Sequence, residues 1–149
     1  MEFIALSTIL ARGEKSISPR ALYRLQQPLV EALIEWREGS GDDDGSGQLT
    51  PQSIEISCDE KHINLLAASS NEAKNIISYG HILLTALDHS TLRDKRLWRI
   101  AEQCASGEVA NLETLHLMLE RMVSSTIYRL LLAVILTGIA ILAIYQIMR

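Results

Sequence analysis

The feature that most constrains the fold of this 149-residue chain is an uncharged segment of 19 residues between Arg129 and Arg149. Leucine, isoleucine, alanine and valine make up most of it, and only Thr137 and Gln146 are clearly polar. A helix of this length rises about 28 Å, which is close to the ~30 Å thickness of a bilayer's hydrocarbon core. A buried core helix is usually shorter or has a polar edge. The segment therefore predicts a transmembrane helix over residues 127–148.

The residues that flank this helix indicate how it lies in a membrane. Tyr128 and Tyr145 fall near its two ends, where aromatic rings prefer the membrane–water interface. Arg121 and Arg129 precede the apolar segment and Arg149 follows it, and this small excess of positive charge favours a cytoplasmic N-terminal side. No signal peptide opens the chain. We therefore expect a single-pass tail anchor, which in a bacterium would lie in the inner membrane.

The rest of the chain has the composition of a soluble domain. Apolar residues make up 48% of the whole chain, and the C-terminal segment raises this figure. The 18 acidic and 14 basic residues give a net charge of -4, and no run of five or more Lys or Arg occurs, which argues against nucleic-acid binding. Cys58 and Cys104 form no Cys-x-x-Cys pair, so the sequence predicts neither a zinc knuckle nor a disulfide framework.

Apolar residues recur at steps of three and four along most of the soluble part, which predicts helices. Ser18 and Pro19 form a helix start, because serine caps well and proline fits the first turn. Ser57 and Glu60 form a capping box, which predicts a helix from residue 57 to about residue 74. No segment alternates with period two for long enough to predict a strand. The predicted fold is therefore all α, with helices over residues 2–12, 18–27, 29–36, 57–74, 80–87, 94–105 and from 111 onward.

These helices are expected to form two units joined by a linker. Residues 39–48 are rich in glycine, serine and aspartate, which is typical of a flexible, solvated linker. A calcium loop does not fit there, because with Gly45 as the turn glycine the twelfth position is Pro51, where a bidentate glutamate is needed. The predicted organisation is a first, incomplete helical repeat over residues 1–38, the linker over 39–48, a second helical repeat over 49–123 and the transmembrane tail anchor over 127–148.

The sequence contains no arrangement that favours catalysis or metal binding. Asp88, His89 and Ser90 have the residue types of a catalytic triad, but consecutive residues cannot face one another to relay a proton. The four histidines lack the spacing of a metal site, and His81, inside an apolar run, is expected to hydrogen-bond across helix ends. No Gly-x-x-x-x-Gly-Lys-Ser/Thr phosphate loop occurs. We therefore expect a protein that is not an enzyme, with no catalytic residue, metal, cofactor or small-molecule substrate.

The two halves of the soluble part are similar to each other. Residues 3–9 align with residues 81–87, and residues 22–25 align with residues 97–100, with a three-residue gap between the two alignments. Repeated helical units that stack can bury a shared core. The sequence therefore predicts an internal repeat.

These repeated segments resemble the Clp repeat, the N-terminal domain of Clp-type AAA+ unfoldases, whose helix reads Glu-His-Leu-Leu-Leu-Ala-Leu-Leu. Here residues 80–87 read Gly-His-Ile-Leu-Leu-Thr-Ala-Leu, keeping the histidine, and residues 2–9 read Glu-Phe-Ile-Ala-Leu-Ser-Thr-Ile, keeping the glutamate. The first copy lacks the helix that precedes this one in the family. The resemblance covers roughly residues 1–122, and it implies two degenerate helical repeats with an apolar groove between them. The candidate groove residues are Phe3, Leu6, Tyr23, Trp36, His81, Leu84 and Trp98.

The resemblance and the anchor together predict a membrane-anchored adaptor or docking module. Such a module would bind a peptide or helix of a protein partner in the apolar groove. The resemblance implies that the partner is an AAA+ unfoldase, its client or an envelope assembly. The alternative is a structural single-pass subunit of a membrane-associated assembly such as a secretion apparatus, in which the helical domain packs against its neighbours.

Overall fold

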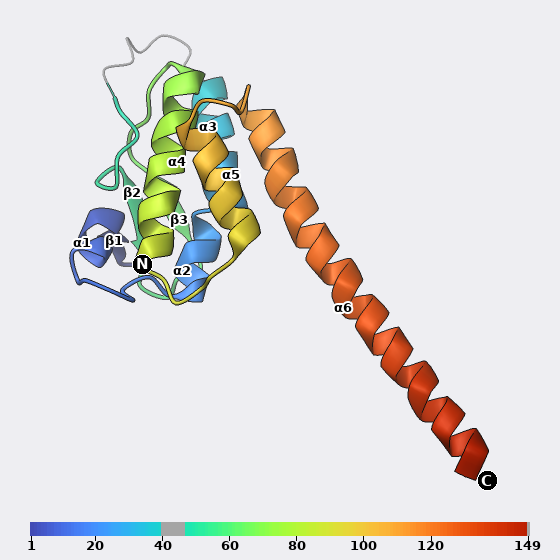
Figure 1. Ribbon diagram of the computed structural model, residues 1–149. Coiled ribbons are helices and arrows are strands. Elements are labelled where there is room, and N and C mark those ends of the chain that lie inside the picture. The colour runs from blue at the N-terminus through green and yellow to red at the C-terminus, as the bar shows by residue number, and fades with distance from the viewer. Residues whose placement is uncertain (40–46, 149) are drawn as a thin grey trace. The chain divides into compact units, whose positions relative to one another are not determined.

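The computed structural model describes residues 1–39 and 47–148 (Figure 1). They form two compact units, of which the first, here called the folded unit, is Met1–Leu119 and the second begins at Glu120. Most of the predicted linker lies outside the described residues. The chain is mostly helical, and its elements in order are β1 (Phe3–Ala5), α1 (Leu6–Leu10), α2 (Pro19–Arg24), α3 (Gln27–Gly39), β2 (Ile54–Ser57), β3 (Ile63–Leu65), α4 (Glu72–Asp88), α5 (Lys95–Ala105) and α6 (Leu112–Met148).

Three of the helix starts expected from the sequence, at Ser18, Asp94 and Asn111, are confirmed. The side-chain oxygen of each accepts a hydrogen bond from the backbone N–H of the second or third helical residue, at distances between 2.8 and 3.0 Å. Such caps satisfy N–H groups that have no partner inside the helix. The starts of α2, α5 and α6 therefore follow directly from local sequence.

The all-α prediction is wrong at three short segments, because the folded unit contains an antiparallel sheet in the order β1-β2-β3. β1 replaces the first part of the predicted helix over residues 2–12, and β2 and β3 lie where the helix over 57–74 was expected to begin. In β2, Ile54 and Ile56 are buried and Glu55 between them is half-buried, which is the alternation of a strand. Strands this short give too little alternation to identify from the sequence.

The turn between β2 and β3 explains why the capping-box interpretation was wrong. Ser57 Oγ accepts hydrogen bonds from the backbone N–H groups of Lys61 at 3.2 Å and His62 at 2.9 Å, and it donates one to Asp59 Oδ1 at 2.6 Å. Glu60 has a φ of +56°, which no helix accommodates. The serine hydroxyl therefore closes a hairpin turn with the same chemistry that would cap a helix.

The predicted repeat is only partly matched by secondary structure. Residues 3–5 form β1, whereas residues 81–87, with which they were aligned, lie inside α4. Residues 22–24 and residues 97–100 are both helical, in α2 and α5. The first alignment is therefore wrong over residues 3–5, because similar apolar content occurs in a strand and in a helix, whereas residues 6–9 and 84–87 are both helical, in α1 and α4.

Helices α4 and α5 approach each other closely at Gly80, in the middle of α4. A Cβ atom placed on Gly80 would lie 2.3 Å from the backbone nitrogen of Ala105 and 2.7 Å from the carbonyl oxygen of Ala101. A hydrogen atom at this position thus lets α4 and α5 pack backbone against backbone. The buried side chains of the two helices include Ile76, Tyr79, Leu83, Leu97, Ile100 and Cys104.

The two cysteines are expected to differ sharply in reactivity, since Cys58 is exposed and Cys104 is buried. Burial raises the pKa of the Cys104 thiol from 9.0 to about 12, so its thiolate fraction near neutral pH falls by roughly a thousand-fold. A thiol reagent should therefore modify one cysteine in the folded protein and two in denaturant. Two equally fast reactions without denaturant would contradict the packing of α5.

Replacing Tyr79 with phenylalanine is expected to stabilise the folded unit. Tyr79 is fully buried, and within the described part of the chain its hydroxyl has no hydrogen-bond partner. Burial, with a smaller contribution from Cys104, raises the pKa of this hydroxyl well above its ordinary value. Removing an unpaired buried hydroxyl should raise the free energy of unfolding by about 1 kcal/mol, measured by denaturant titration. A decrease of similar size in the free energy of unfolding would instead show that the Tyr79 hydroxyl bonds a water or another partner.

Candidate membrane anchor and docking surfaces

Helix α6 has one segment that is long and apolar enough to cross a membrane. Every residue from Thr126 to Met148 is exposed, including Tyr128 and Tyr145 near the ends of the predicted span. Thr137 Oγ1 donates a hydrogen bond to the carbonyl of Ala133 at 2.8 Å, so this hydroxyl is satisfied inside its own helix. A core helix of a soluble protein would bury such a segment. Arg129, at the start of the span, is exposed, and Arg149 lies outside the described residues.

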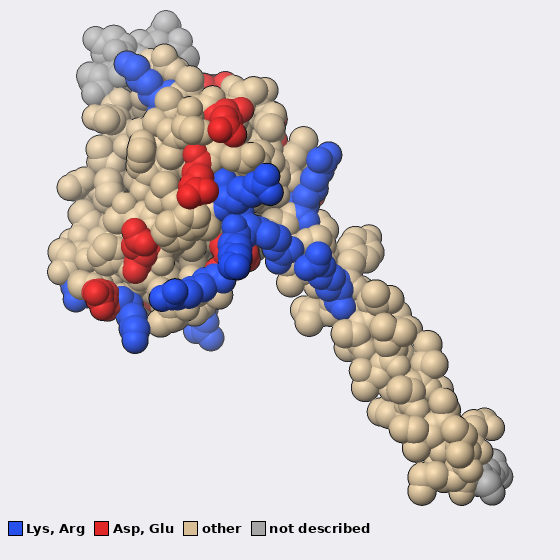
Figure 2. All heavy atoms as spheres, in the orientation of Figure 1, with Lys and Arg blue, Asp and Glu red and all other residues tan. Residues whose placement is uncertain are grey.

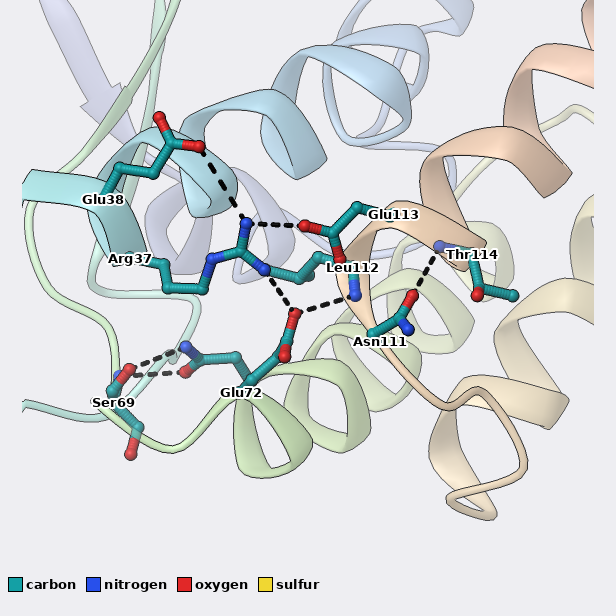
Figure 3. A network of polar contacts seen from close by, with 9 residues as sticks. Arg37, Glu38, Ser69, Glu72, Asn111, Leu112, Glu113 and Thr114 are labelled. Carbon is teal, nitrogen blue, oxygen red and sulfur yellow. Dashed lines mark hydrogen bonds and ion pairs between the residues drawn. The ribbon is translucent and has the colours of Figure 1, made fainter.

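Within the folded unit, the first turn of α6 is held to α3 and α4 by a cluster of charged side chains (Figure 3). Arg37, near the end of α3, contacts Glu72 of α4 at 2.9 Å and Glu113 of α6 at 2.6 Å. Glu72 Oε1 also accepts a hydrogen bond from the backbone nitrogen of Leu112 at 2.9 Å. The arginine therefore joins three helices. The hydrogen bond with Glu113 raises the pKa of Arg37 and holds the pKa of Glu113 below its ordinary value.

This cluster predicts a specific loss of stability in acid. Because the pKa of Glu113 is lower in the folded state than its ordinary value of 4.5, the pair stabilises the fold fully above that pH. The contribution disappears as the pH falls through the lowered pKa. In Arg37→Gln this part of the pH dependence should vanish, whereas Arg12→Gln, at an exposed arginine, should keep it. Denaturation midpoints between about pH 5 and pH 3 measure the difference. Parallel curves for all three proteins would contradict the pairing.

The seven residues predicted to line a groove lie in different parts of the folded unit. Those that are buried or half-buried are Phe3, Leu6, Trp36 and Leu84. Those that are exposed are Tyr23, His81 and Trp98, and the Arg24 guanidinium lies 5.4 Å from the ring centroid of Tyr23. Of the hollows in the folded unit, His81 lines one and Trp98 lines another. Among the described residues the His81 ring has no hydrogen-bond partner, so the expectation that it bonds across helix ends is wrong.

The first surface, here called the α4 groove, runs between α4 and residues 47–51. It consists of two adjoining hollows of about 430 and 280 Å³ that share Gln48, Leu49 and Ser78. His81 and Thr85 line one end and Lys74 lines the other. The groove therefore combines apolar surface with several hydrogen-bonding side chains.

The wall of the α4 groove is fixed by Asn75, a buried residue of α4. Its side chain pairs with the backbone of Ser69, accepting from the nitrogen at 2.8 Å and donating to the oxygen at 2.7 Å. This two-way pairing satisfies the buried carboxamide and fixes the position of the chain just before α4. Sequence reasoning missed the groove because residues 47–51 and 74–85 meet only in the folded chain, and residues 47–48 were assigned to a linker.

The second surface, here called the α5 basic surface, consists of exposed residues at the start of α5. They are Leu92, Arg93, Lys95, Arg96, Trp98 and Arg99. Figure 2 shows Lys and Arg side chains gathered on the face over which α5 lies in Figure 1. A hollow of about 420 Å³ is lined by the apolar Leu87, Leu92 and Trp98, by the basic Arg93 and Lys95 and by the acidic Asp88 and Asp94. The surface thus combines an apolar centre with four exposed basic side chains, Arg93, Lys95, Arg96 and Arg99, and fewer acidic ones.

Two of the acidic residues of this region, Asp94 and Glu102, are engaged by α5 itself, and Asp94 Oδ1 also lies 3.7 Å from Arg96 Nε. A third, Asp88, is exposed and lines the hollow. Asp94 Oδ1 accepts hydrogen bonds from the backbone nitrogens of Arg96 at 2.9 Å and Leu97 at 3.4 Å. Glu102 Oε1 accepts one from Trp98 Nε1 at 2.9 Å. This surface was not predicted from the sequence, because its basic residues form no run of five or more. A step of three between Arg96 and Arg99 on one helix face was the available signal.

The comparisons with known proteins add no relative. No family model matches the chain, and neither a curated protein nor a solved structure is significantly similar to it. Within residues 1–39 and 47–148, no group of three or more His, Cys, Asp or Glu side chains is placed to hold a metal ion. The candidate sites are therefore the exposed segment of α6, the α4 groove and the α5 basic surface.

Proposed function

We propose that this protein is a single-pass, membrane-anchored docking module that holds its folded unit on the cytoplasmic side and binds a peptide of a protein partner. The observation that carries the proposal is the apolar segment of α6, which is fully exposed and follows directly on a compact folded unit. Exposed apolar area on this scale is unfavourable in water. A bilayer, or another protein within a bilayer, removes that cost.

The α4 groove supports the docking part of the proposal. An extended peptide needs hydrogen-bond partners for its backbone and apolar contact for its side chains. Gln48, Ser78 and His81 supply the first, and Ile77, which is 37% exposed, supplies the second. A groove that combines hydrogen-bonding and apolar side chains in this way suits binding rather than catalysis. The proposal does not rest on the Clp resemblance, because residues 3–5 and 57–65 lack the helices that the resemblance implied.

A groove-filling substitution tests the docking role. Ser78 lines both hollows, so Ser78→Phe should occupy the space that the peptide needs. Ala73→Phe is the matched control, because Ala73 is an exposed residue of the same helix that lines neither hollow. A photoreactive amino acid at His81 should crosslink one partner in the membrane, and Ser78→Phe should abolish this adduct while Ala73→Phe retains it. An adduct that survives in both variants would exclude the α4 groove.

The alternative function is a structural subunit, and the extent of exposed apolar surface on α6 favours it equally. The two functions predict different losses. In an adaptor, Ser78→Phe should release the partner and leave any larger membrane complex at its original size in detergent. In a structural subunit, the same substitution should leave complex size unchanged and release nothing, whereas substitutions within the span should remove the protein from the complex.

A further inference from the structure

We propose that the α5 basic surface binds anionic lipid headgroups on the membrane that α6 enters, and this inference rests on the anchorage part of the proposed function. Residues 93–99 hold four of the chain's 14 basic residues and one acid. In a chain with a net charge of -4, this concentration of positive charge is local. The leaflet that faces the cytoplasm carries negative charge, which attracts basic clusters close to a membrane span.

The apolar residues of the surface fit the same occupant. Trp98 is 36% exposed and Leu92 is 40% exposed, although both belong to a folded unit that buries most of its large apolar side chains. Tryptophan is enriched where a membrane meets water, because its ring is apolar and its N–H is polar. The Trp98 N–H is already bonded to Glu102, so the ring can leave water without an unsatisfied donor. Basic groups around an exposed aromatic ring match a charged interface.

Because α6 tethers the folded unit to the membrane, a weak attraction between the α5 basic surface and the lipid is sufficient for contact. A few basic side chains bind a bilayer poorly when they must first find it, but α6 keeps the folded unit close to the bilayer at high effective concentration. Ser124 and Thr126 donate hydrogen bonds to the carbonyls of Glu120 and Met122. Such side-chain bonds to the backbone slightly destabilise a helix, here just before the span. The headgroup contact would then fix which face of the folded unit meets the membrane and leave the α4 groove open to a partner.

Quenching of Trp98 by brominated lipid tests this contact in the full chain. Trp36→Phe leaves Trp98 as the only tryptophan. The protein is reconstituted into brominated phosphatidylcholine vesicles with or without phosphatidylglycerol. We expect several-fold stronger quenching with the anionic lipid, and we expect about 1 M salt, where charges are screened within about 3 Å, to abolish the difference. Equal quenching in neutral and anionic vesicles would overturn the proposal.

Charge reversal identifies the residues. Arg93→Glu, Lys95→Glu and Arg99→Glu together should reduce the quenching to the level of neutral vesicles. The matched control reverses three exposed basic residues elsewhere, Arg12→Glu, Lys15→Glu and Arg20→Glu, and should keep the quenching. An unreactive Cys104 in both variants shows that the folded unit is intact. An equal loss in the control would overturn the assignment to α5.

Two further outcomes distinguish the lipid contact from a failure of the membrane anchor and from binding of an acidic protein. Failure to float with vesicles of either composition would refute the membrane anchor itself, whereas flotation with unquenched Trp98 refutes only the lipid contact. A change in Trp98 emission on adding polyglutamate, with no response to anionic vesicles, would show that the α5 basic surface binds an acidic segment of a protein and not lipid.

Discussion

Replacing Leu136 and Ile141 with arginine is expected to move the protein from the membrane fraction to the soluble fraction. Both residues are exposed near the middle of the apolar segment, and a spacing of five places them on different sides of α6. Each arginine at the centre of a transmembrane helix costs about 3 kcal/mol on insertion scales. Two would weaken insertion by roughly ten-thousand-fold. Sedimentation after alkaline carbonate extraction measures the distribution.

The matched control adds the same charge to the folded unit. Ala11 and Ala73 are exposed, so Ala11→Arg with Ala73→Arg should leave the protein in the membrane fraction. If the Leu136 and Ile141 variant stays resistant to carbonate while the control does too, then α6 is not embedded in lipid.

Gly80→Ala is expected to destabilise the folded unit, although alanine is the better helix former by about 1 kcal/mol. The new methyl group would meet backbone atoms of Ala101 and Ala105, which cannot move as a flexible side chain would. Overpacking of this kind costs about 3 kcal/mol, so the packing term should win by about 2 kcal/mol. For a unit of this size the melting temperature should fall by about 10 °C.

Tryptophan fluorescence follows this unfolding without interference from α6, because Trp36 and Trp98 both lie in the folded unit. Gly39→Ala is the control, since an added Cβ there meets nothing within 4 Å. A Gly80→Ala protein that melts at or above the temperature of the original would show that α4 and α5 do not cross at this glycine.

Local chemistry explains which parts of the fold the sequence could predict. The cap at Ser18 and the long apolar run of α6 depend on neighbouring residues, so they could be predicted from the sequence. Ser57 misled because its hydroxyl accepts backbone hydrogen bonds in a hairpin turn as readily as in a helix cap. The role of Gly80 could not be predicted, because it depends on contact with Ala101 and Ala105 of the following helix, α5.

The candidate surfaces were harder to predict than the elements. Trp98 and His81 were predicted to line one groove, and both are exposed but line separate hollows. Leu6 was predicted to line the same groove and is fully buried. Amphipathic periodicity shows which face of a helix is apolar, but only the packing of the other elements decides whether that face is core or surface.

We propose that α6 crosses a membrane once with the folded unit on the cytoplasmic side, and the accessibility of two thiols tests this arrangement most directly. Cys58 is exposed in the folded unit and Cys104 is buried, so Cys58 reports one side. Met148→Cys in a Cys58→Ser background reports the other. A membrane-impermeant maleimide should label the Met148→Cys protein in intact cells and Cys58 only in inverted vesicles. Labelling of both thiols from the same side would show that α6 does not cross the membrane.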